Sequence, residues 1–396
     1  MYRKSIIICY LCLLLGCGTN PDSDMGLEVI NIVEGIKSSG SRIFLSEVAK
    51  DIDFIPLETT NECLIGKSRM FFSDKYIVVA DWQQDMIFLF DRNGKFIRKI
   101  GSKGQGPGEY IDPAMFVLSG DKLFLWDSKM SMLCYDLKTG GCLHEKYYNS
   151  EYETGYFNPA TIGCLNDSLL VYYTAYPFPD IDPKGFSHLH VTNYDFTVTY
   201  NVYSDKYTTP ISGNEFNDIQ ICQYIKDGYM HIWRNDDGII YRITDSLEII
   251  PVYKLFLGRY DLIGQSNNFG DRKFLITDIQ ESNNFFFITG IFNHDYTKCI
   301  IYDKITKKSQ SLIYDDDYGD NFHNDIDGSI GFWPLGYASE NVLYNYASVI
   351  GLKKIMDHPY VKGIEVKNKE KYRKIKDYLS SADEDNNPIV FLVTIN

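Results

Sequence analysis

Ser73-Asp74-Lys75-Tyr76-Ile77-Val78-Val79 is a polar turn that leads directly into a run of apolar and aromatic residues. Successive copies of this pattern lie 46 to 60 residues apart. A four-stranded propeller blade needs about 40 to 50 residues, and longer connections absorb the excess. The pattern therefore predicts six repeats of one β unit. The five further copies are Gly120–Leu125, Asn166–Val171, Lys226–Ile232, Ser282–Ile288 and Ser339–Tyr344.

A second apolar strand follows each of the first five copies, as in Met86–Asp91 and Cys299–Asp303. Between strands lie turn sequences such as Asp91-Arg92-Asn93-Gly94-Lys95, whose Asn-Gly pair tolerates the positive φ angles of a tight hairpin. Tyr (31) and Phe (24) are abundant, which also favours strands. Each unit thus consists of strands joined by tight turns.

The two ends of the chain each supply a strand that the repeat does not account for. Asp51–Leu57 precedes the first copy, and Ile389–Ile395 ends the chain. A closed ring leaves no blade edge unpaired if these two strands meet. We therefore expect an all-β fold, a six-bladed β-propeller with the N-terminal strand closing the last blade. A short helical insertion is expected near residues 369–380, where charged residues surround a narrow apolar stripe.

The N-terminus has the pattern of an export signal. Arg3 and Lys4 precede the apolar segment Ser5–Leu15, which is shorter than the roughly 20 residues that span a bilayer. The segment ends in Leu14-Leu15-Gly16-Cys17, which resembles a bacterial lipobox. We expect a signal peptide over 1–16, lipidation at Cys17, a lipidated tether over 17–40 and the propeller over 41–396. The alternative is an ordinary cleaved signal with an incidental cysteine.

This pattern predicts a cell-envelope protein, an outer-membrane lipoprotein that contacts the membrane only through its lipid anchor. The net charge of −14 becomes −16 once residues 1–16 are removed. Such an acidic body argues against nucleic acid as a partner.

Six cysteines remain after the signal and the lipidation site, and none forms a CxxC pair. Because most lie within apolar runs, buried free thiols are favoured. A Cys134–Cys142 bridge across a hairpin is the alternative.

Several stretches carry a family resemblance. The most specific is Lys99–Tyr110, supported by Ile55–Thr59, Phe90–Phe96 and Asn324–Gly328. Together they resemble the six-bladed β-propeller lipoprotein family of gut Gram-negative bacteria, with NHL- and TolB-like repeats. The resemblance implies the propeller fold and an envelope location. It implies no activity and no catalytic residues.

The glycines of the Lys99–Tyr110 stretch do not form a phosphate-binding loop, because neither a following helix nor a Gly-Lys-Ser/Thr ending is present. A connection between blades is favoured. Alternatively, this loop shapes a binding surface at the mouth of the ring. The candidates for a binding surface are Gly104, Gly106, Gly108, Glu109, Tyr110, Trp82, Trp126 and Tyr176.

Carboxylates suggest a calcium site, because Ca²⁺ is bound by oxygen ligands. Asp81 and Asp127 end equivalent strands, and Asp325 and Asp327 belong to an acidic stretch. Hydrogen bonding to turn amides is the favoured role of such aspartates, and the acidic stretch fails the EF-hand pattern. No cofactor is therefore predicted, and Ca²⁺ at these four residues is the less favoured alternative.

His188 and His190 share a face if their segment is a strand, but the sequence identifies no third metal ligand. Neither Gly-x-Ser-x-Gly nor His-Glu-x-x-His is present. We expect a non-catalytic binding or scaffold propeller whose partner is a glycan, a peptide or an envelope protein. The alternative is an enzyme, a lactonase-like hydrolase or a lyase, with a metal in the central channel; catalytic residues are unassigned.

Overall fold

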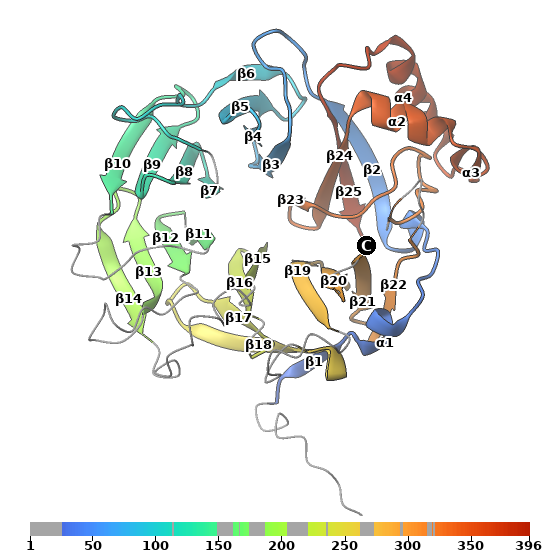
Figure 1. The fold of residues 1–396 in the computed structure, drawn as a ribbon, viewed down its shortest axis with the longest axis horizontal. Coiled ribbons are helices and arrows are strands. Elements are labelled where there is room, and N and C mark those ends of the chain that lie inside the picture. The colour runs from blue at the N-terminus through green and yellow to red at the C-terminus, as the bar shows by residue number, and fades with distance from the viewer. Residues whose placement is uncertain are drawn as a thin grey trace, which may run out of the picture.

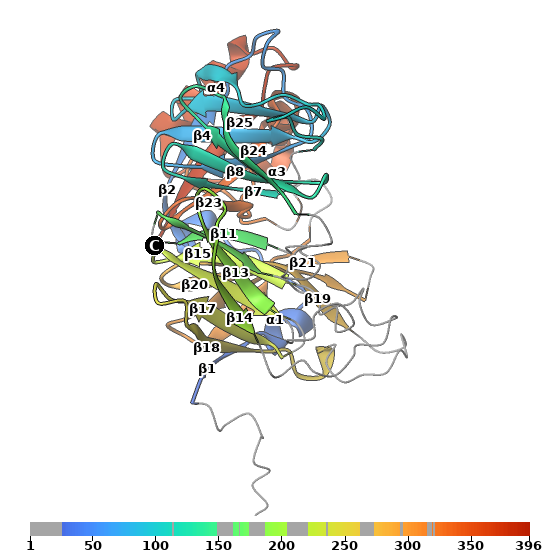
Figure 2. The ribbon, with the colours of Figure 1, turned by 90° about the vertical axis from the view of Figure 1, so that its left-hand side faces the viewer.

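A ring of six sheets forms the body of the protein (Figure 1). The computed structural model describes residues 26–112, 115–148, 161–165, 167–173, 187–203, 221–234, 237–261, 273–293, 296–314, 319 and 321–396. Five sheets have four strands and one has five. Figure 2 shows the ring from its edge. The predicted all-β, six-bladed propeller is confirmed.

Blades 1 to 3 follow the chain in order, and each begins with its innermost strand. Blade 1 contains β3 (Ser68–Phe72), β4 (Tyr76–Asp81), β5 (Met86–Asp91) and β6 (Phe96–Lys99). Blade 2 contains β7 (Met115–Ser119), β8 (Lys122–Asp127), β9 (Ser131–Asp136) and β10 (Cys142–Tyr147). Blade 3 contains β11 (Thr161–Leu165), β12 (Leu169–Tyr173), β13 (Ser187–Asn193) and β14 (Val198–Tyr203).

Blades 4 and 5 repeat this arrangement. Blade 4 contains β15 (Ile221–Lys226), β16 (Tyr229–Arg234), β17 (Ile239–Ile243) and β18 (Ile249–Phe256). A 3-10 turn, Gly258–Tyr260, follows it. Blade 5 contains β19 (Phe274–Glu281), β20 (Phe285–Phe292), β21 (Tyr296–Asp303) and β22 (Lys308–Ser311).

Blade 6 closes the ring with strands from both ends of the chain. It contains β23 (Gly336–Ser339), β24 (Val342–Ala347), β25 (Ile389–Ile395) and β2 (Ala49–Pro56). β2 pairs antiparallel with β25, with Phe54 opposite Phe391. This is the predicted closure, in which β2 pairs with the outer edge of β25 and becomes the outermost strand of blade 6.

Three helices interrupt blade 6 between β24 and β25, on the rim of the ring (Figure 1). They are α2 (Val349–Asp357), α3 (Pro359–Lys362) and α4 (Lys369–Ser381). α4 lies where the charge pattern predicts a helix. Lys371 on α4 donates to the carboxylates of Asp51 and Asp53, each at 2.6 Å from Nζ, and thereby fixes the closing strand.

The segment from residue 28 to β2 is part of the folded body, which corrects the expected boundary between a tether that ends at residue 40 and a propeller that begins at residue 41. β1 (Glu28–Asn31) adds a fifth, parallel strand to the outer edge of β18. α1 (Val33–Lys37) follows, and Lys298 of β21 donates to the carbonyls of Ile36 and Ser38 at 2.6 and 2.5 Å. The folded part therefore begins well before residue 41. A 3-10 turn, Leu45–Glu47, leads into β2.

Turn chemistry fixes the strand pairing. At the β15–β16 turn, Asp227 and Gly228 both have positive φ (53° and 76°), the geometry of a type I′ hairpin. Gly94 in the β5–β6 turn has φ +84°, and its carbonyl accepts from the Glu58 amide at 2.8 Å, just beyond β2. This turn joins blade 1 to the closing blade.

Candidate functional site

The innermost strands of all six blades line a central channel of about 700 Å³. Small-molecule pockets occupy about 300 to 1,000 Å³, so the channel has the size of a ligand site. The strands that line it are β3, β7, β11, β15, β19 and β23.

Polar side chains gather on the wall formed by blades 4 and 5. Gln280 donates through Nε2 to both carboxylate oxygens of Asp278, at 3.2 and 3.0 Å, and Gln223 donates to the Ile162 carbonyl at 3.1 Å. The Oε1 atoms of both glutamines are buried and accept no hydrogen bond from any described residue. Buried acceptors are normally paired, so these two unpaired oxygens are exceptional in a folded protein.

Burial raises the pKa of Asp278 above its ordinary value, although the Gln280 bonds and the charge of Arg69 act in the opposite direction. The carboxyl group is therefore closer to its neutral form than an exposed aspartate. A neutral carboxyl group donates as well as accepts, which suits hydroxyl-rich ligands.

The wall formed by blades 1 and 2 lies across the ring from blades 4 and 5 (Figure 1) and includes Phe71, Met115 and Val117. The Phe71 ring lies 3.9 Å from that of Phe116, centroid to centroid. Arg69 is the charged residue on this wall, with its guanidinium 5.5 Å from the Phe71 ring centroid. The channel is therefore amphipathic.

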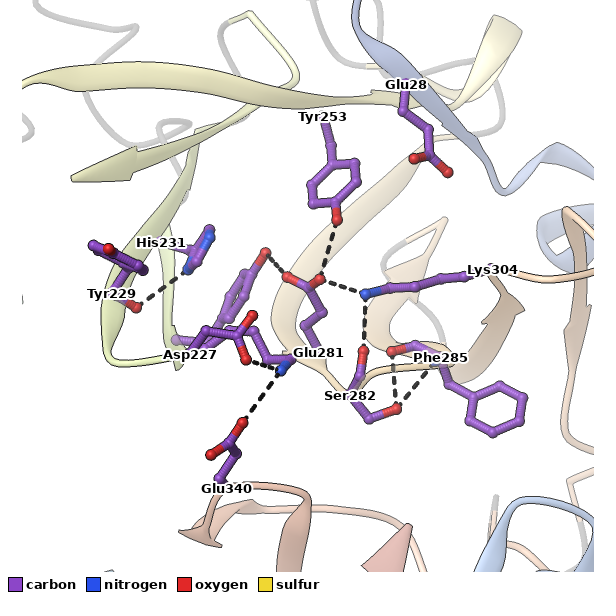
Figure 3. Close-up of polar contacts among 12 residues, drawn as sticks. Glu28, Asp227, Tyr229, His231, Tyr253, Glu281, Ser282, Phe285, Lys304 and Glu340 are labelled. Carbon is purple, nitrogen blue, oxygen red and sulfur yellow. Dashed lines mark hydrogen bonds and ion pairs between the residues drawn. The ribbon is translucent and has the colours of Figure 1, made fainter. Parts of the chain in front are cut away.

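Behind the polar wall, Glu281 of blade 5 contacts residues of blades 4 and 6, and Figure 3 shows its contacts with Tyr253 and Lys304. Its carboxylate accepts from the Tyr224 hydroxyl at 2.7 Å and the Tyr253 hydroxyl at 3.3 Å, and it pairs with Lys304. Its backbone carbonyl accepts from the Tyr337 hydroxyl of blade 6 at 2.8 Å. Both charged side chains are largely buried, so each depends on the other for compensation.

Burial changes the proton affinity of this network. It lowers the pKa of Lys304, partly offset by Glu281, and it raises that of Tyr224. Burial also lowers the pKa of His231, whose ring stacks on Tyr224 at 4.9 Å and 4°. Tyr224 and Glu281 are each 3% exposed, and Tyr224 also lines the channel, so its hydrogen bond to Glu281 connects the channel wall to this buried network.

At the end of the channel where the β15–β16 and β23–β24 turns lie, an ionic contact links blades 4 and 6, which are not neighbours. Lys226 at the end of β15 pairs with Asp227 and lies 3.9 Å from the Glu340 carboxylate, which belongs to blade 6 (Figure 3). The positive charge of Lys226 is therefore already compensated.

The Lys99–Tyr110 loop is a self-supporting connection between β6 and β7, and none of its residues lines the channel. The Glu109 carboxylate accepts from the Gly106 amide at 2.8 Å, and the Gly108 amide donates to Glu145 at 2.7 Å. The Gly104 amide donates to the Tyr110 carbonyl at 2.9 Å. Tyr110 is 1% exposed, because its ring packs in the core between blades 1 and 2. The prediction that it belongs to a binding surface is therefore wrong.

The two tryptophan candidates differ. Trp82 is 52% exposed but does not line the channel, whereas Trp126 is 7% exposed and packs against Tyr148. The expectation of a binding surface is therefore wrong for Trp126. Their neighbouring aspartates serve turns: Asp81 accepts from the amides of residues 66, 83 and 84, and Asp127 from those of residues 111 and 112.

Asp325 and Asp327 point to different partners. Asp325 accepts from the amide and hydroxyl of Ser46 and pairs with Lys367 at 3.0 Å. Asp327 is fully buried and accepts from Asn324 and Ser329. Within the ranges that the structure describes, no three His, Cys, Asp or Glu side chains are grouped as metal ligands.

The remaining candidates are the lipidation site, Tyr176, the acidic run, the two histidines and the cysteine pair, and some of them lie outside the described residues. Cys17 and Tyr176 lie outside the described residues, as does most of the acidic run before Asp325. His190 is buried on β13, and nothing is described of the His188 side chain. Cys134 and Cys142 form no disulfide with each other, so the alternative of a bridge between these two described residues is wrong.

The fold and the channel define the class of protein as a six-bladed propeller with a ligand-sized central channel. Residues 27–394 match the family described as a domain of unknown function, DUF4934, and the chain belongs to this family. In the described part of the chain, no helix is long and apolar enough to cross a membrane.

Among solved structures, one with a TM-score above 0.5 shows the same fold. A Bacteroides fragilis protein described as an exported protein is 17% identical, with a TM-score of 0.65, over 93% of this chain and 99% of that one. A DUF4221 family member from Bacteroides vulgatus is 11% identical over 88% and 97%, with a TM-score of 0.44. Virginiamycin B lyase from Staphylococcus aureus is 12% identical over 67% and 74%, with a TM-score of 0.37. A comparison with curated proteins finds no match.

Sequence reasoning missed the channel residues Arg69, Gln223, Asp278 and Gln280. Each lies on the innermost strand of a blade, directly ahead of the repeated turn. A polar residue at an inward position of the first strand in blades 1, 4 and 5 is the signal that identifies them, and it becomes visible once the blades are aligned.

Proposed function

We propose that this protein is exported to the cell envelope, anchored there by lipid at Cys17, and binds a glycan in its central channel without transforming it. The observation that carries the proposal is the amphipathic channel wall. A sugar ring presents an apolar C–H face and a rim of hydroxyl groups. Phe71 and Met115 suit the face, while Gln223, Asp278 and Gln280 suit the rim.

The size of the channel supports this choice over the other partner classes. A volume of about 700 Å³ takes a short oligosaccharide but not a folded envelope protein. The role as a binding protein is supported by polar side chains of the channel wall, among them the amides of Gln223 and Gln280 and the carboxyl group of Asp278. Glu281 itself is 3% exposed and is not one of the residues that line the channel.

A glycan panel screened against the purified protein tests the binding function, with mass spectrometry of each bound glycan to detect any chemical change. For a glycan that binds, Gln280→Met should weaken affinity at least tenfold, because it removes a hydrogen-bonding group from the wall. Gln83→Met is the matched control, since Gln83 is exposed and lies outside the channel. Binding that Gln280→Met leaves unchanged contradicts a site in the channel.

The anchor is tested separately. Radiolabelled palmitate should be incorporated into the wild-type protein in cells, and Cys17→Ser should abolish incorporation and release the protein from the membrane fraction. Membrane retention of Cys17→Ser without label contradicts the lipid anchor and leaves the channel proposal intact.

A further inference from the structure

Arg69 is the channel residue whose chemistry is least satisfied by the protein itself. It is exposed on β3, lines the channel and lies over the Phe71 ring. Its guanidinium makes no hydrogen bond or ion pair with any residue that the structure describes. An arginine presents five N–H donors, so this group retains its full capacity for a ligand.

The other described cation of the channel wall is not available in this way. Lys226 is paired with Asp227 and approaches Glu340. Asp278 is close enough to interact with Arg69 electrostatically, but its oxygens already accept from Gln280, and its burial favours the neutral form. Arg69 therefore has no ion-pair partner of its own among the described residues of the channel, whose other charged lining residues are Lys226, Asp227, Asp278 and Glu340.

The position of this charge selects among ligands. A planar guanidinium matches a planar carboxylate through two parallel N–H···O bonds, and a single guanidinium balances a single negative charge. The guanidinium also lies beside the apolar wall, so the anionic group must be attached to a molecule that has an apolar face. A uronic acid residue meets both conditions, because its carboxylate projects from the edge of a sugar ring.

We infer that the channel binds an acidic glycan, a segment containing uronic acid, whose carboxylate is held by the Arg69 guanidinium. This inference rests on the proposed glycan-binding function and specifies its ligand class. The ring of the uronic acid lies against Phe71 and Met115, and its hydroxyl groups reach Gln223, Asp278 and Gln280 across the channel.

Calorimetric titration of the purified full chain tests the inference. The probes are oligouronides of two to four residues and the same oligosaccharides after reduction of their carboxyl groups to alcohols. Wild type should bind the oligouronides at least tenfold more tightly than the reduced forms. Arg69→Gln should remove that preference, and Arg69→Lys should retain part of it, since lysine keeps the charge without the planar fork.

Lys67→Gln is the matched control, because it removes the same charge two residues away, outside the channel, and should leave the preference unchanged. Equal binding of both probe forms by wild type overturns the acidic class while the glycan site stands. Selectivity for short peptides with free carboxyl termini, or for sulfated sugars, over oligouronides also overturns it. Failure of every glycan probe to bind overturns the proposed function itself. Unchanged selectivity in Arg69→Gln refutes the role of this residue.

Discussion

Replacing Glu281 by glutamine should destabilise the propeller strongly, although the two side chains have nearly the same shape. The change leaves the Lys304 ammonium buried without its carboxylate, and loss of one member of a buried pair costs about 3 to 5 kcal/mol. Lys304 keeps the Ser282 carbonyl at 2.8 Å and the Phe286 ring at 4.5 Å, which places the cost at the lower end. The hydrogen bond from the Tyr224 hydroxyl then has a neutral acceptor, and its contribution to stability falls by about 1 kcal/mol. We expect a loss of about 3 to 4 kcal/mol.

Urea denaturation followed by tryptophan fluorescence at pH 7.5 measures this loss. A double-mutant cycle with Lys304→Met isolates the pair, because the double variant contains no buried, uncompensated charge. We expect a coupling free energy of about 2 kcal/mol. The exposed pair between Glu370 and Lys374 on α4 is the control, and Glu370→Gln should leave the denaturation midpoint unchanged.

The pH dependence gives a second check. Because the folded-state pKa of Lys304 is lowered, the unfolded chain binds more protons in the window below the ordinary lysine pKa of 10.5. Stability from this group therefore rises with pH there. Glu281→Gln removes the carboxylate that opposes the lowering, so the deficit of the variant should shrink as pH rises. A coupling free energy within 0.5 kcal/mol of zero, at about the precision of such cycles, refutes this account of the network.

Two further predictions concern the seam and the acid stability of the ring. Gly94→Ala should destabilise the protein by about 1 to 3 kcal/mol more than Gly120→Ala in the same urea assay. Both positions have positive φ, but an added Cβ clashes with the Pro56 carbonyl oxygen at Gly94 and meets nothing at Gly120. Equal losses contradict close packing at the Gly94 turn. Because burial lowers the pKa of His231 from 6.5, the folded state should lose stability as pH falls below about 6.5, and His231→Gln should reduce that loss. His144→Gln, at an exposed site, should not alter the pH profile, and identical profiles for both variants refute the role of His231.

The blades could be predicted because their signals are local. Each turn marker and the apolar run after it occupy fewer than ten residues, and strand periodicity and turn chemistry act at that range. The closure of blade 6 followed from two unassigned strands and the need to pair a sheet edge.

The partners of other segments depend on tertiary placement. β1 is a four-residue segment whose pairing with β18 crosses more than 200 residues, and no local pattern specifies it. Glu281 stands just before a polar turn, where a glutamate is ordinarily exposed. It is buried because three tyrosines and a lysine from other strands converge on it. Tyr110 was misplaced for the same reason, since its loop position suggested exposure and blade packing buries it.

The attachment of β1 has a mechanical consequence for a chain held by its N-terminus. A pulling force applied before residue 28 acts first on the hydrogen bonds between β1 and β18. It acts next on the hydrogen bonds from Lys298 to the end of α1. The closing strand β2 lies downstream of both. The pairing of β1 with the outer edge of blade 4 therefore protects the ring closure. The pairing of β2 with β25 bears tension only after the contacts of β1 and α1 have broken.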